Sequence, residues 1–434
     1  MGTEFMSEQR PAVIRRIFLR LVPLLFIAYV TAYLDRVNIG FAALTMNKDI
    51  GLSATSYGLG AGMFFIGYFF FEIPSNLLLE RFGARRWIAR IMVTWGLLSM
   101  AMVFVTGPAS FLTLRFLIGF AEAGFFPGVI LYLTYWFPQA YRARIIAAFM
   151  IAIPASLALG APVSTSILQI GNVAGLSSWQ WLFLLEGIPP LVLAVIVLFC
   201  LPDRPRNAKW LSDEERGWLE ATLEREGRAV EAEHGMTLRR IFTEPRVFAL
   251  AFIYFADTTA NLGLAFFLPQ ILNALGLTLT ETGLFTALPY VVGTIGTLAW
   301  GYVSDRMNER RVNLTVALTV AAIGLIGAGL WSHSLIAVAF MSFAAIGIYG
   351  AKAPFWPLPS MLLSGTAAAG GIALINALGN LGGFVGPYMV GWIKDETQSF
   401  EAGLYMLAAW CLAGAFLTLV VVRPRERAAE TVSP

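Results

Sequence analysis

Apolar stretches of about 20 residues, repeated along almost the whole chain, constrain this sequence more than any other feature. A helix needs about that length to cross the hydrocarbon core of a bilayer. Of the 434 residues, 58% are hydrophobic and 13% are charged, whereas soluble domains average roughly 45–50% and about 25%. We therefore predict an all-α membrane protein that crosses the bilayer many times.

Twelve candidate spans can be placed between the polar connections of the chain. They cover 18–45, 57–79, 87–106, 110–136, 144–169, 181–201, 247–272, 281–303, 312–332, 335–363, 366–393 and 402–422. All but five of the 30 Lys and Arg residues lie at the termini or at the even-numbered connections. Such residues concentrate on the cytoplasmic side, so we expect both termini to be cytoplasmic.

The spans group into two six-helix bundles that flank one long polar connection. The expected order is a cytoplasmic N-terminus at 1–17 (1–5 resembling an expression scar), a bundle at 18–201, a linker at 202–246, a bundle at 247–422 and a cytoplasmic tail at 423–434. In the linker, Ser212 and Glu215 form a capping-box pattern, followed by Trp and Leu at helical spacing. This predicts a short amphipathic helix on the cytoplasmic membrane surface that tethers the two halves.

A short charged motif occurs at corresponding points of the two halves. Residues 80–86 (ERFGARR) follow the second span, and 305–311 (DRMNERR) follow the eighth. This repeat predicts an internal duplication with pseudo-two-fold symmetry, and transporters built this way hold their substrate near the midplane between the repeats. The candidate residues of these conformational gating loops are Glu80, Arg81, Arg85, Asp305, Arg306 and Arg310.

The paired loops resemble the signature of the major facilitator superfamily, and the match covers the whole chain. Residues 33–38 (YLDRVN), 71–76 (FEIPSN) and 115–124 (RFLIGFAEAG) resemble the anion:cation symporter family, which comprises organic-acid/proton symporters of the tartrate, phthalate and sugar-acid type. The resemblance implies a proton-coupled symporter that imports an organic carboxylate by alternating access. It also implies that Asp35 and Glu122 take part in proton coupling.

Four ionisable residues lie inside apolar stretches of the first half: Asp35, Arg36, Arg115 and Glu122. A charge near the bilayer centre costs at least about 2.5–3.5 kcal/mol, so such residues usually have a function. Arg115 and Glu122 share a helix face, roughly 10 Å apart along the axis, whereas the adjacent Asp35 and Arg36 diverge by about 100°. We expect Asp35, Arg36 and Arg115 at a similar depth, with Glu122 deeper.

These positions suggest separate tasks for the four charges. By resemblance, Arg36 binds a substrate carboxylate, and we expect Asp35 to pair with a neighbour such as Arg115. Glu122 is expected to be less fully paired and to change its protonation state during transport, with Arg115 in the same proton-coupling group. The alternative is a static ion-pair cluster that only holds helices together. A structural role is also the more usual one for Glu72 and Glu186.

The second half offers different chemistry. Three prolines interrupt the tenth span and predict a kink, with Trp356 forming an apolar wall beside it. Lys352 either pairs with Asp257 or, if free, provides a second positive anchor that favours a dicarboxylate such as tartrate or an aromatic acid such as phthalate. Asn376 either binds substrate or joins helices. The resemblance places Tyr33, Tyr68, Trp356, Ser360 and Asn376 at the substrate.

Catalytic and metal-binding chemistry is not expected. The chain has two Cys and two His residues, and neither pair suggests a metal site or a nucleophile with its base. We therefore predict no enzyme activity, no cofactor, no metal and no nucleic-acid partner, and expect a monomer in a bacterial inner membrane that handles a small organic anion and protons. The alternatives are a sugar-acid or monocarboxylate symporter, an organic-anion exchanger, or a channel or sensor on a carrier fold.

Overall fold

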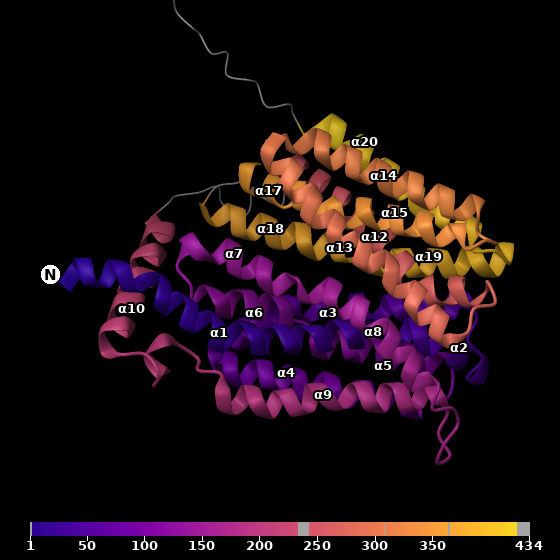
Figure 1. The fold of residues 1–434 in the computed structure, drawn as a ribbon, viewed down its shortest axis with the longest axis horizontal. Coiled ribbons are helices and arrows are strands. Elements are labelled where there is room, and N and C mark those ends of the chain that lie inside the picture. The colour runs from indigo at the N-terminus through magenta and orange to yellow at the C-terminus, as the bar shows by residue number, and fades with distance from the viewer. Residues whose placement is uncertain (1, 233–242, 308, 363–364, 423–434) are drawn as a thin grey trace, which may run out of the picture.

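The computed structural model describes residues 2–232, 243–307, 309–362 and 365–422. Throughout these residues the chain is built from long helices packed side by side (Figure 1). The predicted tail at 423–434 and part of the linker lie outside the described residues, as do the side chains of Asp305 and Ser360. The prediction of an all-α fold is confirmed for the described part of the chain.

The first half and the linker contain α1 (Gly2–Val37), α2 (Ile39–Asp49), α3 (Ala54–Phe82), α4 (Ala84–Ala101), α5 (Pro108–Glu122), α6 (Phe125–Thr134), α7 (Gln139–Met150), α8 (Ala152–Leu168), α9 (Ser178–Cys200) and α10 (Asp213–Ala232). The second half contains α12 (Pro245–Asn273), α13 (Leu279–Met307), α14 (Arg310–Leu330), α15 (Ile336–Gly350), α16 (Lys352–Phe355), α17 (Pro357–Leu362), α18 (Gly365–Asn380), α19 (Gly382–Thr397) and α20 (Glu401–Val421). Short 3₁₀ turns follow α4 and α9.

Eleven helical stretches of the described residues are long and apolar enough to cross a bilayer. They correspond to all the predicted spans except 366–393. That segment consists of α18 and α19, which have 16 residues each and meet at Leu381. The protein is therefore a multi-pass membrane protein, and the predicted span 366–393 is made of two shorter helices.

The helix break after Glu122 has a clear local cause. Gly124 adopts a left-handed conformation with φ of +86°, which side chains with a Cβ rarely adopt. A Cβ at this position would also lie 2.1 Å from the Ser75 hydroxyl. The break makes Glu122 the last residue of α5 and fixes where its carboxylate can point.

The two halves of the chain meet mainly along three helix pairs. α3 packs on α19, α8 on α13 and α2 on α12, and Figure 1 shows the indigo-to-magenta half beside the orange-to-yellow half. At the end of the bundle opposite the Arg-rich connections, Asp395 accepts hydrogen bonds from the backbone nitrogens of Ala54 (3.1 Å) and Thr55 (2.8 Å). Below them, Gly58 approaches the backbone of Pro387. The halves are thus closely packed at this end.

The linker helix α10 is attached to the first half. Arg16 donates to both carboxylate oxygens of Glu215 at 3.0 Å, and Trp210 stacks on Trp136 with ring centroids 5.9 Å apart. The predicted capping box is confirmed, because Ser212 and Glu215 exchange backbone-to-side-chain hydrogen bonds of 3.0 and 3.2 Å. These contacts hold α10 against the N-terminal part of α1, which the charge bias predicts to be cytoplasmic.

Gly119→Ala is expected to destabilise the protein. A Cβ on Gly119 would lie 1.9 Å from the backbone oxygen of Phe64, so α3 and α5 would have to separate. Overpacking of this kind costs about 1–3 kcal/mol or more, which a thermal unfolding measurement in detergent would record as a lower Tm. Gly107→Ala, at the residue just before α5, is the control, because nothing lies within 4 Å of its added Cβ. Equal Tm values for the two variants would contradict the close packing.

Candidate functional site

Arg36 and Glu122 form a buried ion pair between α1 and α5. The Nη2 atom of Arg36 donates to Oε1 of Glu122, whose side chain is 1% exposed. The Arg36 guanidinium also lies over the rings of Tyr33, Phe64 and Tyr68, with its Cζ 5.2, 5.0 and 5.4 Å from their centroids. We call these three rings the aromatic cage. The expectation that Glu122 is less fully paired is wrong for Oε1, whereas Oε2 has no partner among the described residues.

Asp35 points away from this ion pair. Its Oδ2 atom accepts a hydrogen bond of 2.9 Å from the indole nitrogen of Trp95, and Oδ1 faces Ser99 at 3.4 Å and Asn38 at 3.5 Å. The expected pairing of Asp35 with Arg115 is therefore wrong. The physical reason is the divergence of adjacent side chains on a helix, which turns Asp35 toward α4 while Arg36 faces α5.

Arg115 lies next to one ring of the cage, Phe64. Its Cζ is 5.1 Å from the centroid of the Phe64 ring, so the two guanidinium groups share that ring. The side chain is 1% exposed, and its Nε and Nη2 atoms have no hydrogen-bond partner among the described residues. A buried cation in this state is costly. Arg115 can therefore donate to an anion that enters beside Arg36.

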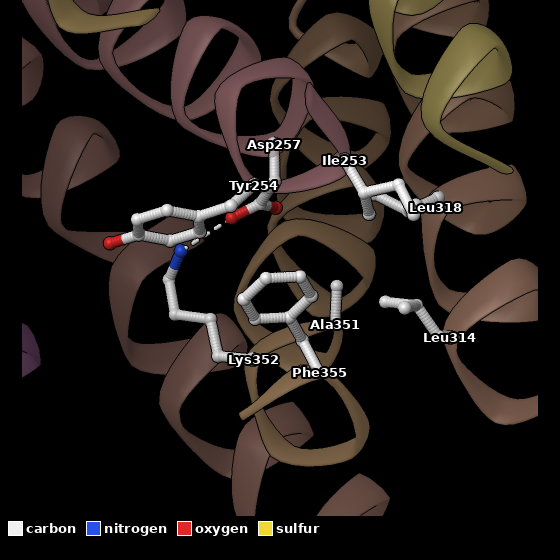
Figure 2. Close-up of a pocket in the computed structure, with 8 residues that line it drawn as sticks. All are labelled: Ile253, Tyr254, Asp257, Leu314, Leu318, Ala351, Lys352 and Phe355. Carbon is white, nitrogen blue, oxygen red and sulfur yellow. Dashed lines mark hydrogen bonds and ion pairs between the residues drawn. The ribbon is translucent and has the colours of Figure 1, made fainter. Parts of the chain in front are cut away.

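Lys352 forms an ion pair with Asp257. Its ammonium nitrogen is 2.6 Å from Oδ2 of Asp257, and Figure 2 shows this contact at one side of a pocket with apolar walls. The ammonium also lies 6.0 Å from the ring centroid of Tyr254 and 5.9 Å from that of Tyr349. Of the two alternatives from the sequence, the pairing with Asp257 is confirmed, and Lys352 is not a free cation in this structure.

Two other predicted substrate residues, Trp356 and Asn376, lie on different segments of the second half. Trp356 sits between α16 and α17, so the tenth span is interrupted where the prolines predict. Its ring packs edge-on against Tyr254, with centroids 5.1 Å apart, and Tyr254 also lies near Lys352. Asn376 instead donates to Oε1 of Glu72 at 3.2 Å, which joins α18 to α3 across the two halves. Asn376 therefore makes the helix-joining contact, which is one of its two alternatives.

The described gating-loop residues are either exposed or hydrogen-bonded to nearby residues, and Glu186 is buried. Glu80, Arg81 and Arg306 are exposed. The backbone nitrogen of Arg85 donates to Asp203 at 2.8 Å, and Nη1 of Arg310 donates to Ser304 at 2.8 Å. Glu186 is buried and accepts a 2.7 Å hydrogen bond from Ser164, as expected of a structural partner.

Sequence reasoning missed three residues that shape the site. Phe64, Trp95 and Tyr254 hold or face the charged groups, yet each is an aromatic residue in an apolar span. Phe64 lies four residues before Tyr68, which was a candidate, so helical spacing could have identified it. For Trp95 and Tyr254 the signal is absent, because their roles depend on which helices become neighbours.

A family model of the Major Facilitator Superfamily matches residues 25–387 and 247–434. The chain belongs to this superfamily. Members of the superfamily among its relatives are transporters, so this major facilitator is a secondary transporter and not an enzyme. The match confirms the family suggested by the charged loop motifs.

Relatives that align with nearly the whole length of this major facilitator are named as transporters. A "Putative tartrate transporter" of Agrobacterium vitis is 49% identical over 98% of this chain and 94% of its own length. A second protein of that name from the same organism is 47% identical over 99% of both chains. The inner membrane transport protein RhmT of Escherichia coli is 40% identical over 97% of both chains.

Solved structures show the same fold at low sequence identity. The inward-open xylose transporter XylE of E. coli aligns with a TM-score of 0.76 at 14% identity and covers 94% of this chain and 97% of its own. An inward-facing bacterial homologue of the human lysosomal transporter Spinster aligns with a TM-score of 0.71 at 17% identity, over 94% of this chain and 95% of its own. These likenesses establish the major facilitator fold alone.

Proposed function

We propose that this protein is a proton-coupled symporter that imports an organic carboxylate, with a dicarboxylate such as tartrate as the first candidate. The observation that carries the proposal is the buried Arg36–Glu122 ion pair inside the aromatic cage. The names of the Agrobacterium vitis relatives support the same substrate class. The protein would act as a monomer in a bacterial inner membrane.

The ion pair provides a way to couple an anion to a proton. A substrate carboxylate that binds Arg36 must compete with Glu122 for the same guanidinium. Displaced Glu122 would then be a buried charge without a partner, which costs several kcal/mol. Taking up a proton removes that charge. Substrate and proton therefore bind together, and each makes the binding of the other more favourable.

Neighbouring residues would assist this exchange. The unpartnered nitrogens of Arg115 would stabilise the anion beside Arg36. Asp35, held by Trp95, would be a second proton site whose hydrogen bond changes when α1 moves against α4. Tyr33 and Tyr68 would contact the substrate from the cage, and Trp356, Asn376 and Ser360 from the second half.

Alternating access would use the contacts between the halves. In this proposal the chain has twelve spans, with both termini cytoplasmic and bundles at 18–201 and 247–422. The Asp395 contact closes the outer side, and the Glu72–Asn376 contact joins the halves on the cytoplasmic side. The loops with Glu80, Arg81, Arg85, Asp305, Arg306 and Arg310 would guide the rocking of the halves.

Proteoliposomes containing the purified protein are expected to accumulate radiolabelled tartrate when the outside is one pH unit more acidic than the inside. The membrane potential is held at zero with potassium and valinomycin, and empty liposomes are the control. Saturable accumulation above the outside concentration that a protonophore abolishes supports symport. Uptake that requires tartrate inside indicates an exchanger, and unsaturable flux indicates a channel; either result contradicts the proposal.

A further inference from the structure

Each half of the chain holds one buried ion pair, and the two pairs have opposite polarity. In the first half the cation, Arg36, is on the first span and the carboxylate, Glu122, is on the fourth. In the second half the carboxylate, Asp257, is on α12, the first span of that half, and the cation, Lys352, is in the fourth. The internal duplication makes these spans equivalent, so both repeats use the same two helices for an ion pair.

The second ion pair has a carboxylate oxygen that is free to accept a further hydrogen bond. Asp257 is 4% exposed, and its Oδ1 atom has no hydrogen-bond partner among the described residues. The pocket beside the pair, in which Figure 2 shows both side chains, is otherwise lined by apolar side chains and Tyr254. The titratable or charged groups that face Asp257 are Lys352 on α16, Tyr254 on α12, Tyr349 on α15 and Cys411 on α20. Lys352 is thus the single permanent charge among them.

Tyr33 connects the two ion pairs in space. Its ring lies 5.2 Å from the guanidinium carbon of Arg36, and its phenol also interacts electrostatically with Lys352. The cations of the two halves therefore both lie near one tyrosine. A molecule with a carboxylate at each end has the charges to bridge them.

We propose that Lys352 and Asp257 form the second half of a dicarboxylate-and-proton site, which rests on the function proposed above. The substrate bridges Arg36 and Lys352, and Asp257 takes up a proton when Lys352 exchanges it for a substrate carboxylate. The empty pairs carry two positive and two negative charges. The loaded site carries the same two cations, two substrate carboxylates and two neutral acids, so its charge is unchanged. One proton thus accompanies each carboxylate of the substrate.

Asp257→Asn tests this coupling in the proteoliposome assay, with tartrate and threonate compared. Threonate has a hydroxymethyl group in place of one tartrate carboxylate and engages only the Arg36–Glu122 pair. With the potential at zero, the loss of one coupled proton lowers the tartrate accumulation ratio about tenfold per pH unit of gradient. Threonate accumulation is expected to stay unchanged. Asp213→Asn, in the exposed part of α10, is the matched control and should affect neither substrate.

A double variant guards against misfolding caused by an unpaired lysine. Asp257→Asn with Lys352→Gln removes both charges of the second pair, so no unpaired ion is left there. This variant is expected to reduce the preference for tartrate over threonate in equilibrium binding by at least about tenfold. Wild-type accumulation of both substrates by Asp257→Asn, or a wild-type preference in the double variant, overturns the second site but not the symporter. Failure of the unmodified protein to accumulate tartrate overturns both proposals.

Discussion

Glu122→Gln is expected to lose accumulation of tartrate driven by a pH gradient, by at least about tenfold per pH unit, while tartrate counterflow continues. The amide can still accept a hydrogen bond from Arg36, but it cannot exchange a proton when the substrate carboxylate replaces it. Substrate binding and the rocking of the halves do not need that proton. Accumulation under an imposed gradient and exchange at equal pH, both measured in proteoliposomes, separate the two effects.

The control for this variant is Glu186→Gln, another buried glutamate within the spans. Glu186 accepts its hydrogen bond from Ser164, whereas the carboxylate paired with Arg36 is that of Glu122. It should accumulate tartrate as the unmodified protein does. If Glu122→Gln retains full accumulation, the carboxyl exchange at Arg36 is not the coupling step.

Arg36→Ala is expected to eliminate measurable tartrate binding and to lower the thermal stability. Removing one partner of a buried ion pair leaves the other charge uncompensated and costs about 3–5 kcal/mol. The cage also loses the cation that its three rings surround. Isothermal titration with tartrate reports the binding, and thermal unfolding in detergent reports the stability.

A double variant separates these two consequences. Arg36→Ala with Glu122→Gln leaves no unpaired charge, so its Tm should recover toward that of the unmodified protein, whereas tartrate binding should remain absent. Arg36→Lys keeps the charge but not the planar guanidinium, and we expect weakened rather than abolished binding. Tight tartrate binding by the double variant would contradict the role of Arg36 as the carboxylate anchor.

The sequence predicted the positions of the charged residues inside the bundle better than it predicted their partners. Depth along a helix follows from the rise per residue, so Arg36 and Glu122 could be placed inside the bundle from counting alone. Partner choice depends on how α1 is rotated against α4 and α5, which is a property of the packed bundle. This is why Asp35 was assigned to Arg115 but contacts Trp95.

The helix breaks show the same division between local and tertiary causes. Prolines in the tenth span predicted the interruption around Trp356, because a proline weakens the helix wherever it occurs. The break at Gly124 was not predicted, since a glycine within a span can equally continue the helix. Its left-handed conformation and the nearby Ser75 hydroxyl, on α3, are visible only once the helices are packed.

The attachment of α10 to the first half has a practical consequence for measuring motion. Because Arg16 and Trp136 hold this helix through Glu215 and Trp210, a fluorophore placed on its exposed face would stay fixed relative to the first six spans. A second fluorophore at the end of α13 or α20 would belong to the other half. Energy transfer between the two labels would then follow the transport cycle in real time, without any probe in the substrate pathway.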